Sequence, residues 1–299
     1  MAGNRQHLSY RLMTYNIGGG RKRYSSEKSL ILKVIRDVSP DILAIQEAAR
    51  WLDVEGVWHS DLDEVIEVLG KGFVHSVAPT LTMKKQMHPN NRAMVGAIFN
   101  DYQDWQQGNA IVSRWPFHRL GSSDQPGIPH SIPLYRSPVY EGSRDTEPRA
   151  ALMARIGRAP QFPIVIGLHL STLVGERGDD IVPGKPEQAA LLREVETRRL
   201  ISMLREPALD TNEIVFLLGD FNATIDEPSL RHILDEGGFI PATPINAKMS
   251  THSEVKGAID HIFLFPPSRI VEFKSFVVET EEAHQASDHL PVVTEVTIV

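Results

Sequence analysis

Polar residues with the capacity for metal binding or acid–base chemistry stand at the ends of apolar runs in this sequence. Four of them each close a run that must be buried: Asn16, Glu47, His169 and Asp220. The carboxyl ends of buried strands are where α/β folds place their sites, because the sheet fixes the side chains while the neighbouring loops admit a ligand. A single strand-terminal Asn or Asp is usually a turn former. Four such residues in two matching units indicate a shared site instead.

The residue types at these ends favour a hard cation as a ligand. Glu47 follows an apolar run, where a carboxylate is costly unless it is paired with a cation or bound to a metal. For Glu47 alone, a salt bridge to an Arg explains the residue as well as a metal does. The chain contains no Cys, so any metal must be held by oxygen or imidazole ligands. Such ligands favour Mg²⁺ or Mn²⁺.

Further pairs of polar residues add acid–base capacity. Asp220 and Asn222 stand two positions apart, so their side chains point to the same side of an extended segment, with an Asx turn as the alternative. Asp288 and His289 are neighbours before the last apolar run, and Asp260 begins another. A carboxylate beside an imidazole fixes its tautomer and favours imidazolium. One such pair is commonly a surface feature, but its occurrence with the strand ends favours catalysis.

Two units of the same layout must position these residues. Each unit consists of a strand, a helix and a second strand. In the first unit, the strand is predicted at 10–16, the helix from about 26 to before Pro40, and the second strand at 41–47. In the second unit, the strand is predicted at 164–169, the helix at about 186–204, and the second strand at 214–218. Their helices are predicted to bury Leu30, Ile31, Val34 and Ile35 in the first unit and Leu191, Leu192, Val195 and Leu204 in the second.

The rest of the chain reads mainly as strands. They are predicted at 95–99, 109–113, 150–156, 259–265, 270–278 and 290–299. A helix is predicted from Ser60, because Ser60 and Asp63 have the spacing of a capping box. Residues 121–148 have no helical or strand period, so we expect a long surface loop that could select the substrate. No composition break marks a linker, and one two-layered α/β domain over residues 1–299 is expected.

Composition narrows the class of protein. The 299 residues are 41% hydrophobic, which is normal for a globular chain. The net charge of −7 argues against a surface that coats nucleic acid, because binding to that backbone depends on Lys and Arg. Neither a signal-peptide core nor an apolar run of membrane-spanning length is present. We therefore expect a soluble, cytoplasmic protein.

Seven short segments resemble the ordered motifs of the endonuclease/exonuclease/phosphatase superfamily, in particular its deoxyribonuclease I-like members. They are TYNIGGG, DILAIQEA, GNAIVSRWPF, GLHLST, LLGDFNA, AIDHIFLF and SDHLPVV. The series runs from about Leu12 to Val293, nearly the whole chain. One such motif would be weak support, whereas seven in the right order are strong. The resemblance implies a four-layer α/β/β/α sandwich, in which helices flank two facing mixed β-sheets.

The resemblance also implies roles for the acidic and amide residues. Glu47 would bind the divalent cation, Mg²⁺ or alternatively Mn²⁺, with Asn16 and Asp288 close to it. Asp220 and Asn222 would orient the attacking water and the scissile phosphate. Phosphoryl transfer needs this combination of a metal, fixed donors and a positioned nucleophile.

The histidines complete the implied machinery. His289 would act as a general base or charge stabiliser with Asp260 holding its ring, and His169 would donate to a phosphate oxygen. Asn222 and His169 would therefore also bind substrate.

Three neighbouring residues have supporting roles in this interpretation. Arg149 stands where many members place a basic residue, so it could contact phosphate, although pairing with Glu147 explains it equally well. His261 is expected to pack, and Asn109 is expected to support the site from behind.

The leading hypothesis is therefore a metal-dependent phosphodiesterase or phosphatase that acts on a small or lipid-linked phosphoester. The alternative is a nuclease, for which Arg21, Lys22 and Arg23 could supply a basic rim or could simply be a solvated loop. A non-catalytic binding protein of the same fold ranks third, because every expected catalytic position is intact.

Overall fold

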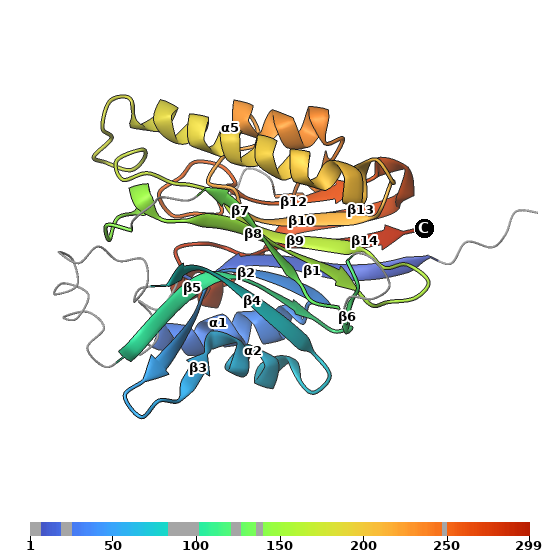
Figure 1. Ribbon diagram of the computed structural model, residues 1–299, viewed down its shortest axis with the longest axis horizontal. Coiled ribbons are helices and arrows are strands. Elements are labelled where there is room, and N and C mark those ends of the chain that lie inside the picture. The colour runs from blue at the N-terminus through green and yellow to red at the C-terminus, as the bar shows by residue number, and fades with distance from the viewer. Residues whose placement is uncertain (1–6, 19–25, 83–101, 121–126, 136–139, 247–249) are drawn as a thin grey trace, which may run out of the picture.

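The computed structural model describes residues 7–18, 26–82, 102–120, 127–135, 140–246 and 250–299. Two β-sheets face each other, with helices on both outer sides (Figure 1). The four-layer α/β/β/α sandwich is thus confirmed. The two-layered expectation was incomplete, because each unit builds its own sheet and the two sheets then pack together.

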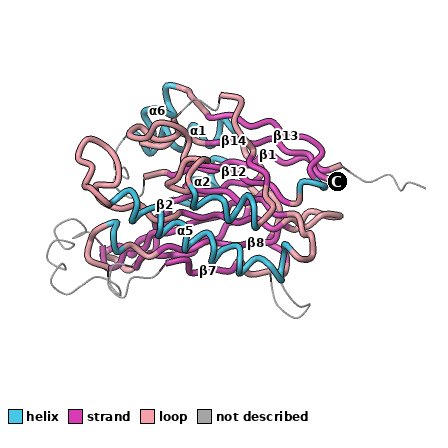
Figure 2. Tube along the Cα trace, turned by 90° about the horizontal axis from the view of Figure 1, so that it is seen from above, coloured by secondary structure: helices cyan, strands magenta, loops and turns pink. Residues whose placement is uncertain are grey.

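The first sheet contains seven strands. Its order is β13 (Ile270–Val277), β14 (Val292–Ile298), β1 (Leu8–Asn16), β2 (Ile42–Asp53), β5 (Tyr102–Ser113) and β4 (Val74–Thr82), with β3 (Trp58–Ser60) paired to β2. Its outer face carries α1 (Ser26–Val38), α2 (Asp61–Leu69) and α6 (Glu281–Ala286), with α1 and α6 side by side (Figure 2). The predicted capping box of α2 is present, since Ser60 and Asp63 exchange side-chain to backbone hydrogen bonds.

The second sheet also contains seven strands. Its order is β11 (Ile240–Pro241), β12 (Asp260–Phe265), β10 (Val215–Asp220), β9 (Ile164–His169), β8 (Arg149–Ile156) and β6 (Phe117–His118), with β7 (His130–Tyr135) paired to β8. Helix α5 (Lys185–Leu204) covers its outer face (Figure 1). Short helical turns lie at Arg144–Thr146, Arg205–Leu209, Pro228–Leu230, His232–Glu236 and Pro267–Arg269.

Alternation along the central strands divides the apolar side chains between two cores. In β10, Phe216 and Leu218 enter the core between the sheets, whereas Val215 and Leu217 pack beneath α5. Strands buried on both faces explain why the sequence shows continuous apolar runs there. The same burial gives the residue that follows each run a rigid support.

Strand direction brings the polar residues to one edge. β9 runs parallel to β10, so His169 and Asp220 lie together at the carboxyl ends of their strands. β1 runs parallel to β2 and ends at Asn16 beside Gln46, but β2 continues to Asp53. The prediction that Glu47 ends its strand was therefore wrong, because β2 passes this edge. β14 and β12 are antiparallel to these pairs, so their amino ends lie at the same edge. Asp260 accordingly pairs with Asp220 in the register. This explains why some site residues end strands while others precede them.

Two expectations about the fold were wrong. Of the residues predicted to face inward on α5, Leu204 is buried, but Leu191 and Val195 are 63% and 57% exposed. The helix also buries three polar residues, Arg193, Glu196 and Thr197. The long loop predicted at 121–148 is interrupted by β7 and by a short helical turn. The predicted strand at 95–99 and the basic segment at 21–23 lie outside the described residues. Among the described helices, none is both long enough and apolar enough to cross a membrane.

Candidate active site

A buried chain of hydrogen bonds and charges forms the centre of the site. His289 Nδ1 lies 2.9 Å from Asp260 Oδ2, and its Nε2 lies 3.6 Å from Asp220 Oδ2. All three side chains are buried. These residues come from three different segments of the chain. The register of β10 and β12 places Asp260 opposite Asp220, and the contact with Asp260 brings His289 to this pair.

The charges in this chain support one another. Burial alone would lower the pKa of His289, but Asp260 and then Asp220 raise it to about 10. Burial raises the pKa of Asp260 to about 6, and Asp220 adds to the effect while His289 opposes it. Burial would likewise raise the pKa of Asp220, yet His289 and the hydrogen bond from Asn16 contribute to lowering it overall. His289 is therefore an imidazolium at neutral pH, held between two carboxylates.

A second histidine approaches the same carboxylate in the opposite charge state. His169 Nε2 lies 3.3 Å from Asp220 Oδ2. Burial lowers the pKa of His169 well below its usual range, and the nearby Arg149 guanidinium adds to the effect. Asp220 thus lies between an imidazolium and a neutral imidazole. The first can stabilise negative charge, and the second can donate a hydrogen bond.

Asn16 links Glu47 to this centre. Its Nδ2 donates to Asp220 Oδ2 at 3.0 Å and to Glu47 Oε1 at 3.5 Å, and its Oδ1 accepts from Gly18 N at 3.0 Å. Glu47 has a positive φ of 58° and lies where the register between β2 and β5 shifts. Such irregularities re-aim a side chain. They turn Glu47 toward Asn16, out of the regular alternation of its strand.

Asp288 lies at the open side of the site. Its side chain is 53% exposed, and Ser287 Oγ donates to its Oδ1 at 3.2 Å and to the carbonyl oxygen of Asn16 at 2.9 Å. His252, which the sequence interpretation missed, has its ring edge-on to that of His289, with centroids 4.6 Å apart. No motif signal marked His252, because it follows an irregular loop and meets the site only through the fold.

Arg149 lies deeper than expected. It is only 3% exposed, and Nη1 donates to Glu147 Oε1 at 3.3 Å while Nε and Nη2 have no hydrogen-bond partner in the described part of the chain. It lines a cavity of about 10 Å³ together with Glu47 and His169. The predicted pairing with Glu147 is present, and the two donors without a described partner leave the phosphate contact as a prediction.

The two supporting residues are buried as expected. Asn109 lines the same small cavity and donates from Nδ2 to the carbonyl oxygen of Ala150 at 2.6 Å, which ties the two sheets together behind the site. His261 is confirmed as a packing residue, because it contacts the rings of Phe221 and Phe263 and its Nε2 lies 2.9 Å from the carbonyl oxygen of Ala223.

Asn222 is held by an arginine that sequence reasoning missed. Its backbone N donates to Asp220 Oδ1 at 2.9 Å, and its Nδ2 donates to the carbonyl oxygen of Leu170 at 3.0 Å. Its Oδ1 accepts from Arg177 Nη2 at 2.5 Å. Arg177 comes from the polar loop after β9, where one charged residue among several gives no periodic signal.

Two groups of residues could bind a cation. The ligand atoms of Asp220, Asp260 and His289 all lie within 4.8 Å of one another, so this buried cluster could hold a metal ion. Glu47 offers a second position: its only described hydrogen bond is the long one from Asn16. Burial, and then the neighbouring Glu147, raise the pKa of Glu47. A carboxylate with so few hydrogen-bond donors requires a nearby positive charge to stabilise it, which a divalent cation would supply.

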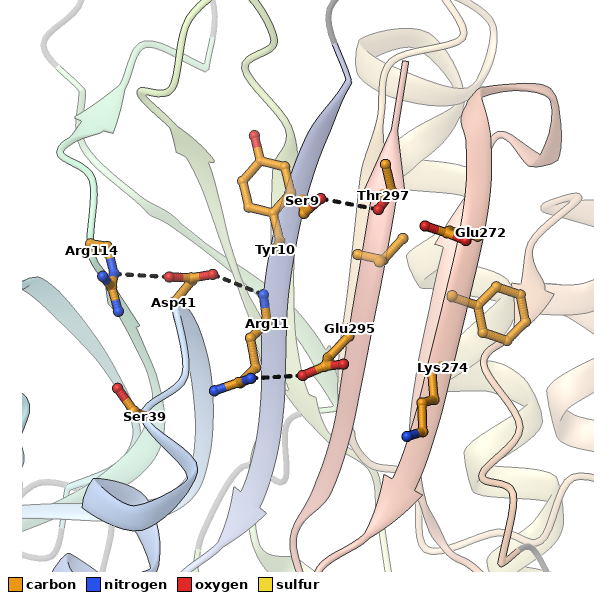
Figure 3. A pocket seen from close by; sticks show the side chains of 12 residues that line it. Ser9, Tyr10, Arg11, Ser39, Asp41, Arg114, Glu272, Lys274, Glu295 and Thr297 are labelled. Atoms are coloured by element: carbon orange, nitrogen blue, oxygen red, sulfur yellow. Dashed lines mark hydrogen bonds and ion pairs between the residues drawn. The ribbon is translucent and has the colours of Figure 1, made fainter.

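A larger cavity lies elsewhere in the described structure. It measures about 540 Å³ and is lined by the opposite end of β1 and by neighbouring parts of β13 and β14 (Figure 3). Its charged groups pair with one another, because Arg11 binds Glu295 at 2.7 Å and Arg114 binds Asp41 at 2.8 Å. This cavity shares no residue with the chain around Asp220, so size alone does not mark the site.

A protein-family model matches most of this chain. A family model described as the endonuclease/exonuclease/phosphatase family matches residues 13–289. No curated protein matches the sequence.

Solved structures share the fold at low sequence identity. A protein of that family from Beutenbergia cavernae has a TM-score of 0.64 and 20% identity, covering 97% of this chain and 72% of the other. The human nocturnin catalytic domain with a bound sulfate anion has a TM-score of 0.65 and 15% identity, covering 99% and 98%. A mannosyl-6-phosphatase from Bacteroides thetaiotaomicron has a TM-score of 0.58 and 15% identity, covering 96% of this chain and 99% of the other. Because the family model spans nearly the whole chain, the chain belongs to the endonuclease/exonuclease/phosphatase family.

Proposed function

We propose that this protein is a divalent-metal-dependent phosphoester hydrolase that directs a water molecule onto phosphorus. The observation that carries the proposal is Asp220, a buried carboxylate that contacts Asn16 and lies between His169 and His289. Family membership supports the reaction class. The mannosyl-6-phosphatase and the sulfate-bound nocturnin domain support a site for a tetrahedral oxyanion.

Each residue around Asp220 has a distinct task in this mechanism. Asp220 orients the water by accepting a hydrogen bond from it, which suits a carboxylate that is ionised at neutral pH. The imidazolium of His289, kept protonated by Asp260, stabilises the negative charge that develops on the phosphoryl oxygens. His169, as a neutral imidazole, donates to another of these oxygens.

The metal is proposed at Glu47, with Asn16 and Asp288 beside it. The alternative cluster is less suitable, because His289 is an imidazolium whose two ring nitrogens both carry protons and offer no lone pair to a cation. Glu47 has only one long hydrogen bond in the described structure, and Asp288 faces solvent from which an ion enters. When bound there, Mg²⁺ or Mn²⁺ would neutralise phosphate charge and polarise the scissile bond.

The substrate is proposed to be a small or lipid-linked phosphoester. The net charge of −7 supports this choice over a nucleic acid duplex, because it disfavours long contacts with a phosphate backbone. The substrate test is a screen of sugar phosphates, inositol phosphates, sphingomyelin, aryl phosphomonoesters and diesters, and DNA with Mg²⁺ or Mn²⁺. Cleavage of DNA alone would replace this substrate class with the nuclease alternative.

The catalytic test uses Glu47→Gln and His289→Ala on whichever substrate is hydrolysed. Each variant should lose at least about 100-fold in kcat, because each removes a group that acts on the transition state. Glu55→Gln and His284→Ala change exposed residues of the same types and should retain wild-type rates. Wild-type rates in both site variants would refute the assignment.

A further inference from the structure

Arg177 offers the site a second guanidinium that the proposed mechanism does not use. It lies in the loop between β9 and α5, eight positions after His169. Its Nη2 donates to Asn222 Oδ1 at 2.5 Å and to Thr172 Oγ1 at 2.9 Å. Its Nε donates to Glu176 Oε1 at 3.0 Å. The guanidinium therefore sits directly against a residue that is proposed to bind the phosphate.

A buried network fixes the orientation of Arg177. Glu176 is buried and also accepts from Leu173 N at 3.0 Å, and Arg193 Nη1 lies 3.2 Å from both of its oxygens. Arg193 in turn donates to both oxygens of Glu227 at 2.8 Å. The network balances two carboxylates with two guanidiniums. Arg177 is thus held in place before any substrate binds, which reduces the entropy lost on binding.

Both Arg177 and Asn222 retain N–H donors that no described hydrogen bond uses. None of the described hydrogen bonds uses Arg177 Nη1, and the side chain is 18% exposed. Asn222 Nδ2 has one described acceptor, the carbonyl oxygen of Leu170, and therefore retains a second N–H. The hydrogen bond from Arg177 to Oδ1 fixes the orientation of the Asn222 amide, because it determines which end of the amide is oxygen and which is nitrogen. Two side chains in direct contact thus each retain an N–H donor for a ligand.

We propose that Arg177 binds the phosphoryl group of the substrate beside Asn222, and that it makes the site prefer a terminal phosphate to a phosphodiester. The inference rests on the proposed function and narrows its substrate class. A terminal phosphate presents three non-bridging oxygens and carries up to two negative charges, whereas a diester presents two and carries one. A fixed guanidinium therefore stabilises the terminal phosphate more strongly, through an additional charge-assisted hydrogen bond.

The test compares Arg177→Gln and Arg177→Lys with the wild type on p-nitrophenyl phosphate and bis(p-nitrophenyl) phosphate, with Mg²⁺ present. Arg177→Gln should lower kcat/KM for the monoester about 10- to 100-fold, the range expected for one hydrogen bond to a charged group. The loss on the diester should be less than about threefold. Inhibition by inorganic phosphate should weaken in parallel with the monoester loss, and Arg177→Lys should recover part of both.

Matched measurements separate binding from folding. Arg198→Gln removes an exposed arginine of α5 that pairs only with Glu194 among the described residues, and it should leave both rates unchanged. Melting temperatures establish that each variant is folded. Equal losses on the two substrates would assign Arg177 a structural role and overturn the inference, as would unchanged kinetics in Arg177→Gln. Wild-type hydrolysis of the diester alone would also overturn it, while leaving the proposed function intact.

Absence of phosphoester hydrolysis by the wild type would contradict the proposed function without testing the role of Arg177. If the wild type hydrolyses no phosphoester, calorimetric titration with inorganic phosphate still tests Arg177. Binding that weakens about tenfold or more in Arg177→Gln supports the contact. An unchanged dissociation constant refutes it.

Discussion

Asp220 lies close to several residues of the candidate site that belong to different sequence motifs. Its Oδ2 lies within 3.6 Å of Asn16, His169 and His289, and its Oδ1 accepts from Asn222 N. Buried carboxylates are stable only when donors and positive charge surround them. The same surroundings that stabilise Asp220 therefore prepare it to orient a water molecule.

Asp260 is expected to act through His289. Asp260→Asn keeps the size of the side chain but removes the negative charge that contributes most to raising the pKa of His289. We expect kcat to fall roughly 10²- to 10⁴-fold with little change in KM, because the imidazole loses its orientation and its protonated state. Steady-state kinetics of the folded variant provide the measurement. The exposed Asp235→Asn serves as the control, and a variant with wild-type kcat would contradict the role of Asp260.

At the scale of elements, strand direction decides which residues meet. Strands β1, β9 and β10 end at one edge, β2 passes the same edge at Glu47, and the antiparallel β12 and β14 begin there. The irregularity near Glu47 then turns one carboxylate out of the regular alternation. Helices α1, α2, α5 and α6 cover the outer faces and hold this edge rigid.

The N-terminus of α2 offers a test of an element that is distant from the proposed chemistry. Ser60 accepts from Leu62 N at 3.2 Å and belongs to a capping box with Asp63. Ser60→Ala should lower the free energy of unfolding by about 1 kcal/mol while leaving kcat unchanged. Urea denaturation measures the loss. Ser202→Ala, at an exposed position within α5, should be neutral or slightly stabilising, and an equal loss there would argue against a capping effect.

At the scale of the whole molecule, the site exists only because two sheets meet. Glu47 and Asn16 belong to the first sheet and Asp220 to the second, and Asn16 joins them by hydrogen bonds. Packing between the inner faces of the two sheets, which includes Phe216 and Leu218, sets the distance between the sheets. A ligand that binds residues of both sheets should therefore stabilise the whole fold.

Metal binding should be visible as thermal stabilisation. Mg²⁺ at about 100 times its dissociation constant should add about 2.7 kcal/mol to the free energy of unfolding, because it binds the folded state. The melting temperature should rise with Mg²⁺, fall again with EDTA and remain unresponsive in Glu47→Gln. A full response in Glu47→Gln, combined with its loss in Asp260→Asn, would place the ion at the cluster of Asp220, Asp260 and His289 instead.

Local patterns in the sequence determined much of the fold and the candidate residues of the site. Continuous apolar runs marked the central strands, because these strands are buried on both faces, and the polar residues at their ends followed from the same pattern. The motif resemblance supplied the facing sheets. Apart from Asp288, the predicted site residues that the structure brings together are buried or nearly buried. Burial of a polar group is unfavourable unless it has a partner, so a polar residue next to an apolar run is a strong indication of a site.

Only the tertiary structure decided the features that depend on distant contacts. Helix α5 exposes Leu191 and Val195 because its inner face carries Arg193 and Glu196, whose hydrogen bonds to Glu227 and Ser171 compensate their burial. Periodicity assumes that apolar residues face inward, so it cannot anticipate a buried polar network. Arg177 and His252 escaped prediction for the same reason: they come from loops without a period, and long-range hydrogen bonds and packing alone bring them to the site.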